Sequence, residues 1–200
     1  MRILSLTLIV LMMIPFSGYQ LKAQDLRDAV RFYDNSMFSR SRSVFDGISE
    51  EVVSSDPEGF SVLSQVRSSA AGYEAVMDSF ISRNPHSVHV PQIRWHHAMN
   101  LFDSHDYKAA GEVLDQIKIK SLYKQQRVDY LFRKAYCDLE NRDLESAKKN
   151  FSDVEKSQVS DYAASSRYAL GYITYVQKDF KTAVEWFEKS RKDSRFSQMS

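Results

Sequence analysis

The chain has 200 residues, 43% of them hydrophobic and 26% charged, so it is long enough to bury a continuous core. Its 27 Lys and Arg nearly balance its 26 Asp and Glu, and the net charge of +1 excludes recruitment of nucleic acid or an anionic membrane by bulk charge. Cys137 is the only cysteine, which excludes an internal disulfide, so packing must provide the stability.

The first 23 residues are predicted to be a secretory signal peptide. Arg2 precedes an uncharged, mostly apolar run over residues 3–14, which is shorter than the roughly 20 residues needed to span a bilayer. Residues 21–23 end on a small residue suitable for cleavage, so the mature chain would begin at Gln24 or Asp25 and carry no transmembrane helix. An uncleaved membrane anchor is the alternative. No Cys follows the run, which excludes a lipoprotein anchor at that junction.

Cleavage would also change the charge and place the protein outside the cytoplasm. Without Arg2 and Lys22, 25 basic residues face 26 acidic ones, a net charge of −1. The Ala23-Gln24 junction is similar to the signals of envelope proteins in Bacteroides-type bacteria. We therefore expect an exported protein of the periplasm or the outer-membrane periphery.

The mature chain is predicted to be all-α and built of helical hairpins. In the last of these, Phe180, Ala183 and Phe187 recur at helical spacing after a break at Lys178-Asp179. Proline within a helix costs about 3 kcal/mol, so Pro57, Pro85 and Pro91 are placed in turns between helices. The predicted array covers residues 24–192, with hairpins at about 25–49, 58–84, 91–119, 125–156 and 161–191, and residues 193–200 are predicted to begin a further repeat, so that the array would continue past residue 200.

The hairpins repeat at intervals of 34 to 37 residues. Four aligned columns carry the repeat: large residues at Phe38, Tyr73, Tyr107, Leu144 and Phe180; mostly small ones three later at Ser41, Val76, Ala110, Ala147 and Ala183; large ones seven later at Phe45, Phe80, Leu114, Phe151 and Phe187; small ones nine earlier at Ala29, Ser64, Ala98, Ala135 and Gly171. If the pattern reflected only chance amphipathicity, the linked columns would have to recur by chance in all five units, so we interpret them as a structural repeat. The first unit departs most from the pattern, since Ser41 replaces the usual Ala and the run of residues 39–43 lowers helix propensity. The second unit is also degenerate, because Ser61, Ser64, Ser68 and Ser69 leave its first helix with little apolar bulk, and we expect it to be strained or locally mobile.

The last hairpin resembles the tetratricopeptide (TPR) family. The residues that match the family pattern are Leu170, Gly171, Tyr175, Asp179, Phe180, Ala183 and Phe187, while Arg167 stands where the family usually has Trp. The turn from Asn84 to Ser87 resembles that of envelope TPR proteins such as outer-membrane assembly lipoproteins. The resemblance implies a right-handed α-solenoid of about five TPR-like hairpins, in which Gly171 and Ala183 allow close approach of two helices.

No residue pattern predicts catalysis, a cofactor or a metal site. His86 and His89 could share zinc or copper with His96 or His97, but adjacent histidines diverge by about 100° on a helix, and no Cys or carboxylate completes the set. Cys137 has no partner signature and is interpreted as a buried structural thiol. The sequence holds no Gly-rich phosphate loop, no Gly-x-Ser-x-Gly and no His-Glu-x-x-His. We therefore expect a protein that is not an enzyme.

The TPR resemblance implies a concave groove lined by the first helix of each hairpin. About half of the rings in this stripe are expected to be core, with Trp95, Tyr136 and Tyr172 exposed. The Lys/Asn clamp by which some TPRs hold a C-terminal carboxylate is absent. Such a groove suits a peptide or partner helix, and less well a polysaccharide stacked on rings. By register, the predicted groove residues are Gln92, Trp95, Met99, Phe102, Asp129, Phe132, Tyr136, Tyr168, Tyr172 and Tyr175.

Two functional hypotheses follow from the sequence. The first is a non-catalytic scaffold of the bacterial cell envelope that binds a protein partner in its concave groove. The second is the targeting or sensing arm of a larger envelope enzyme or signalling protein that continues past residue 200. Further hairpins and a cap beyond that residue would favour the scaffold, and a catalytic signature would favour the arm.

Overall fold

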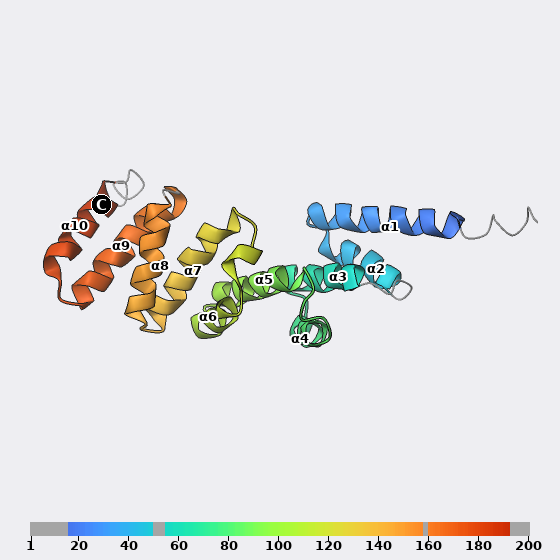
Figure 1. Ribbon diagram of the computed structural model, residues 1–200, viewed down its shortest axis with the longest axis horizontal. Helices are drawn as coiled ribbons and strands as arrows, with labels where there is room; N and C mark the ends of the chain where they lie inside the picture. Colours follow the sequence, from blue (N-terminus) through green and yellow to red (C-terminus); the bar gives the residue numbers. More distant parts are fainter. Residues whose placement is uncertain (1–15, 50–54, 158–159, 193–200) are drawn as a thin grey trace, which may run out of the picture. The chain divides into compact units, whose positions relative to one another are not determined.

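The computed structural model describes residues 16–49, 55–157 and 160–192, and this part of the chain is entirely helical, with no strand (Figure 1). The all-α prediction is confirmed. No helix in the described ranges is both long and apolar enough to cross a membrane. The helices are α1 (Phe16–Asp34), α2 (Phe38–Ser49), α3 (Ser55–Arg67), α4 (Tyr73–Arg83), α5 (Val90–Asp103), α6 (Tyr107–Asp115), α7 (Gln126–Glu140), α8 (Leu144–Lys156), α9 (Ser160–Val176) and α10 (Phe180–Arg191), with a short 3-10 helix η2 (Ile119–Ser121) before α7.

The chain divides within α5 into two compact units, residues 1–93 and 94–200. Each large residue of the first sequence column, from Phe38 to Phe180, is the first residue of the second helix of a pair.

Helix α1 includes the residues on both sides of the predicted signal cleavage junction, and cleavage at that junction stays a prediction. The apolar run at residues 3–14 and the predicted further repeat at 193–200 lie outside the described residues.

One turn geometry joins the helices in four of the five pairs. The residue two before the second helix is left-handed, with φ between 59° and 66°, and the residue after it donates its backbone N–H to the carbonyl five positions earlier. Where that next residue is aspartate, in three of the four pairs, its carboxylate accepts a backbone N–H of the new helix and caps it. The left-handed residues are Ser36, His105, Arg142 and Lys178, and the capping residues are Asp106, Asp143 and Asp179.

Of the three prolines that follow the predicted signal peptide, two lie at helix starts rather than in turns. Pro57 is the third residue of α3 and Pro91 the second residue of α5. The turn placement predicted for them is therefore wrong, because the first turn of a helix needs no N–H at these positions and accepts proline without loss of a hydrogen bond. Pro85 lies in the turn after α4.

The first unit is centred on α3, which packs against both α2 and α4. Its core cluster is Val62, Leu63, Val66, Tyr73, Met77, Phe80, Val90 and Ile93. Of the four serines that suggested too little apolar bulk, Ser61 and Ser64 lie in α3 and are buried, whereas Ser68 and Ser69 follow the helix and are exposed. Ser64 Oγ donates to Phe60 O at 2.8 Å, and Ser61 Oγ donates to the Asp46 carboxylate. Hydroxyls that satisfy their hydrogen bonds can thus occupy a close contact between helices.

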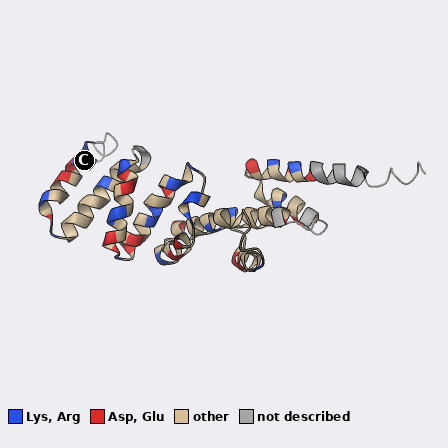
Figure 2. Cartoon of the chain, viewed as in Figure 1, with Lys and Arg blue, Asp and Glu red and all other residues tan. Residues whose placement is uncertain are grey.

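In the second unit α6 to α10 pack in succession, each on the next (Figure 1). Two apolar clusters fill it, one around Trp95, Ala98, Leu114 and Cys137 and one around Ala135, Phe151, Leu170 and Ile173. A polar contact joins α6, α7 and α8 beside them: Lys134 Nζ binds Asp138 and, at 3.1 Å, Asp115, while Asn150 Nδ2 donates to Asp138 at 3.0 Å. Figure 2 shows basic and acidic residues interspersed along these helices.

Candidate functional site

A groove of about 290 Å³ lies between α7 and α9 and is called the α7–α9 groove below. Both helices are the first members of their pairs, so equivalent faces of two successive repeats meet there. The lining is almost entirely apolar and aromatic, with one charged residue. It consists of Phe132, Tyr136, Leu139, Glu140, Phe151, Ser165, Tyr168, Ala169 and Tyr172.

The floor of the groove is held by ring contacts. Phe132 stacks on Tyr162 with 4.7 Å between ring centroids, and it meets Phe151 edge-on at 5.9 Å. Phe151 is only 1% exposed, so this side of the groove is anchored in the core. Tyr168 and Tyr172 are 56% and 48% exposed and form the accessible part of the groove. A preformed floor with exposed rings at its edge is an arrangement that binds a bulky side chain with little reorganisation.

Tyr136 lines the groove together with Glu140, the one charged residue of the lining. Burial of its ring raises the pKa of Tyr136, the negative charge of Glu140 raises it further, and Tyr107 contributes next. The ring of Tyr136 meets Tyr107 at 5.2 Å and Phe102 at 5.6 Å. Tyr136 is thus fixed by neighbouring rings, and Glu140 lies with it in the lining of the groove.

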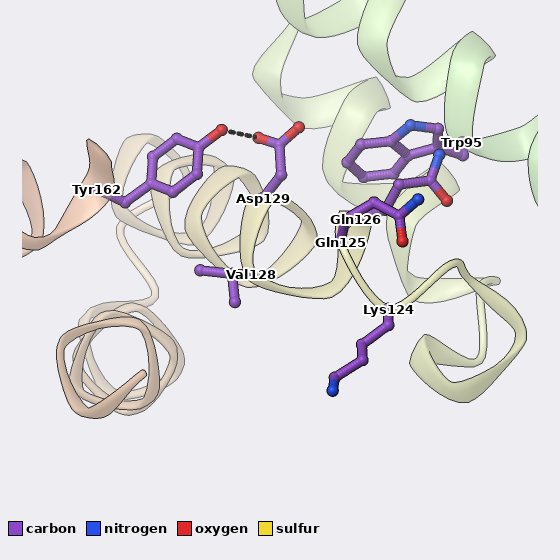
Figure 3. A pocket seen from close by; sticks show the side chains of 7 residues that line it. All are labelled: Trp95, Lys124, Gln125, Gln126, Val128, Asp129 and Tyr162. Carbon is purple, nitrogen blue, oxygen red and sulfur yellow. Dashed lines mark hydrogen bonds between the residues drawn. The ribbon is translucent and has the colours of Figure 1, made fainter. Parts of the chain in front are cut away.

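A second, larger pocket of about 670 Å³ lies at the beginning of α7 (Figure 3). Asp129 is already engaged there: its carboxylate accepts from Tyr162 Oη at 3.0 Å and from Arg133 Nε at 2.9 Å. The lining of this second pocket is more polar than that of the α7–α9 groove, since it includes a lysine and two glutamines. The pocket is lined by Trp95, Lys124, Gln125, Gln126, Val128, Asp129 and Tyr162.

Six of the ten predicted groove residues line one of these two pockets. Phe132, Tyr136, Tyr168 and Tyr172 come together in the α7–α9 groove, and Trp95 and Asp129 lie in the second pocket. Met99 and Phe102 pack half-buried against the Trp95 cluster, while Gln92 is buried. Tyr175 is exposed and lines neither pocket. Whether a partner occupies either pocket stays a prediction.

The expected exposure of Trp95 is wrong, since only 4% of it is exposed. Ile117 and Leu122, from the segment between α6 and α7, belong to the same cluster, and Tyr130 lies 6.5 Å from the indole. The segment between α6 and α7 therefore contributes to the cluster in which this ring is buried, which helical register alone did not predict. Tyr172 is exposed as expected, and Tyr136 is half-buried.

Sequence reasoning missed Tyr162, Glu140 and Ser165. Tyr162 follows Gln126 by 36 residues, which is the repeat interval, so one more aligned column would have placed both at the beginning of their helices. The aligned columns give no such signal for Glu140.

The thiol of Cys137 is fully buried in the second unit. Burial, followed by the charge of Asp138, raises the pKa of Cys137 to about 11. A thiol with that pKa is almost entirely protonated at neutral pH, which agrees with a structural thiol. Among the described residues no three His, Cys, Asp or Glu side chains are grouped so that they could hold a metal ion.

No protein-family model matches the sequence, and no curated protein matches it significantly. Solved structures do match: a mutant of MamA superposes with a TM-score of 0.67 at 9% identity, over 88% of this chain and 99% of that one. MamA from Desulfovibrio magneticus RS-1 gives a TM-score of 0.63 at 16% identity, over 90% and 98% of the two chains. The fold is a TPR-like α-solenoid. That part of the sequence prediction is confirmed, and at these identities the likeness concerns the fold alone.

Proposed function

We propose that the protein is a non-catalytic scaffold that binds a protein partner in the α7–α9 groove. The observation that carries this is the convergence of Phe132, Tyr136, Tyr168 and Tyr172 in one groove. Its volume of about 290 Å³ is at the small end for ligand sites, and a groove of that size receives one or two side chains of a partner rather than a whole cofactor. Exposed tyrosines over a packed floor are the usual anchors of protein interfaces.

The TPR-like fold supports the same proposal, because stacked hairpins present the first helices of successive repeats side by side. The groove chemistry agrees with it. Aromatic rings, one serine and one carboxylate can hold an apolar side chain and orient its polar neighbours.

We further propose that the partner is met in the cell envelope, in the periplasm or at the outer-membrane periphery. The support is the predicted signal peptide at residues 1–23. Fractionation of cells that express the tagged full-length chain, followed by N-terminal sequencing of the product, tests this. A product that begins at residue 24 or 25 in the envelope fraction is expected, and an uncleaved cytoplasmic product would contradict it.

Capture from an envelope extract tests the groove. The chain is compared with Tyr172→Ala, which removes an exposed groove ring, and with Tyr123→Ala, which removes another exposed tyrosine that lines neither pocket. A partner that is retained by the wild-type chain and by Tyr123→Ala, but weakened about tenfold by Tyr172→Ala, is expected from the loss of an interface anchor. Equal capture by all three proteins would remove the groove from the proposal.

A further inference from the structure

The α7–α9 groove carries one negative charge without a counter-ion. Glu140 lies in the lining of the groove, and within the described ranges it forms no ion pair with Lys, Arg or His. Glu140 lies in this lining together with Tyr136, a neutral side chain that does not compensate its charge. A carboxylate at the edge of an apolar groove is attractive to a cation that arrives with the partner.

The cations of α7 and α9 are all engaged elsewhere. Arg127 donates to the carbonyls of Leu122 and Lys120. Arg133 binds Asp129 and Asp103, and Lys134 binds Asp138 and Asp115. Arg167, the single cation of α9, binds Glu155 at 3.3 Å. None of these side chains lines the groove, so the charge facing an incoming ligand there is that of Glu140.

We propose that the partner segment carries a bulky apolar side chain followed or preceded closely by a lysine or arginine. The apolar side chain enters the groove between Phe132 and Tyr172, and the basic group binds Glu140. This inference rests on the proposed function and adds to it the chemistry of the partner. An acidic segment is disfavoured, because it would bring a second carboxylate against an uncompensated one.

Fluorescence anisotropy with short labelled peptides tests the charge preference. The probes share a central Leu or Phe and differ only at one position, scanned over the four residues on either side, which carries Lys, Gln or Glu. With the full chain we expect the best Lys peptide to bind about three- to tenfold more tightly than its Glu counterpart, as for one partly exposed ion pair. The preference should shrink when salt is added, since salt screens exposed charges.

Three variants test whether the preference for Lys over Glu peptides comes from Glu140. Glu140→Gln removes the charge and keeps the shape, so the ratio between Lys and Glu peptides should fall to about one while the Gln peptide binds as before. Glu185→Gln, the same change at an exposed α10 residue that does not line the groove, should keep the wild-type ratio. Tyr172→Ala should weaken all peptides about tenfold, whatever their charge.

Several outcomes would overturn the inference. Glu peptides that bind as well as Lys peptides would do so, as would a charge preference that survives in Glu140→Gln. If none of the peptides binds while capture from extract still depends on Tyr172, the partner has another chemistry and the proposed function stands. Concentration-dependent self-association that is lost in Tyr172→Ala would assign the groove to a second copy of the chain. Binding of polysaccharide fragments in place of the peptides would assign it to a glycan.

Discussion

The ring of Phe187 fills the space that a side chain at Gly171 would need. A Cβ at position 171 would lie 2.7 Å from both Cδ1 and Cε1 of that ring, well inside van der Waals contact. The three nearest atoms to this point all belong to Phe187, so the ring, and not the small residue Ala183, sets the contact at Gly171. Phe187 is in turn packed against Tyr168, with 5.5 Å between ring centroids. The glycine of the repeat therefore supports a tyrosine of the α7–α9 groove.

Gly171→Ala should destabilise the second unit. Alanine gains about 1 kcal/mol in helix propensity over glycine, but forcing a methyl group into the Phe187 ring costs about 1–3 kcal/mol, so we expect a net loss of up to about 2 kcal/mol in a denaturant melt. Gly111→Ala is the matched control in the same unit, since its Cβ would meet Cys137 at an ordinary 3.4 Å. It should be neutral or stabilising. If Gly171→Ala melted at higher denaturant concentration than Gly111→Ala, the contact with Phe187 would not be the reason for the glycine.

The repeat could be predicted from the sequence because large and small residues occupy fixed positions in it. Phe45, Phe80, Leu114 and Phe151 are each at most 1% exposed, and each comes from the column seven residues after the helix start. The turns could not be predicted in the same way. Ser36, His105, Arg142 and Lys178 share a left-handed backbone but no residue type, so the geometry is set by the helices on both sides.

The site could be predicted only in part, because the repeat places residues on helices but does not place the segments that join them. Register assigns a face of a helix, and the rings of α7 and α9 lie together because those two helices are equivalent members of adjacent pairs. Trp95 has the same register position as Phe132 and Tyr168, yet it is buried in a cluster that includes Ile117 and Leu122 from the segment between α6 and α7. A linker has no periodicity, so its packing cannot be read from a repeat.

Phe151→Ala should be strongly destabilising. Phe151 is 1% exposed and contacts Phe132 in the floor of the α7–α9 groove, so its truncation leaves a cavity and costs about 3–5 kcal/mol. Lys149→Ala, two residues away on the exposed side of α8, should change the free energy of unfolding by less than about 0.5 kcal/mol. Denaturant melts of the two variants measure both values. The reverse ranking would mean that the helical register of α8 is wrong.

Cys137 should react slowly with thiol reagents in the folded protein. Its pKa is raised from 9.0 to about 11 by burial, so at a given pH below both values about a hundredfold less thiolate is present than in the unfolded chain, and the side chain is also inaccessible. Labelling with a chromogenic disulfide should be at least about a hundredfold slower in native buffer than in guanidinium chloride. Prompt labelling of the native protein would show that the α6–α7 contact opens readily.

Asp143 is expected to stabilise α8 through its charge as well as its cap. Hydrogen bonds from Ser146, first from its side chain and then from its backbone N–H, lower the pKa of Asp143 below its ordinary value of 3.8. The folded state therefore favours the carboxylate. This stabilisation is complete above pH 3.8 and is lost as the pH falls through the lower folded pKa. Asp143→Ala should cost about 1 kcal/mol at neutral pH, typical of a lost N-cap.

Asp143→Asn separates the two contributions. Asparagine keeps an oxygen that can accept the Ser146 N–H but carries no charge, so it should retain most of the cap. The stability difference between wild type and Asp143→Asn should be small, because the carboxylate is exposed and solvent screens it, and it should vanish as the pH falls below the folded pKa of Asp143. Melts recorded from neutral pH down to a pH of about 3 measure it. A difference that grew on acidification would mean that the folded state raises this pKa instead of lowering it.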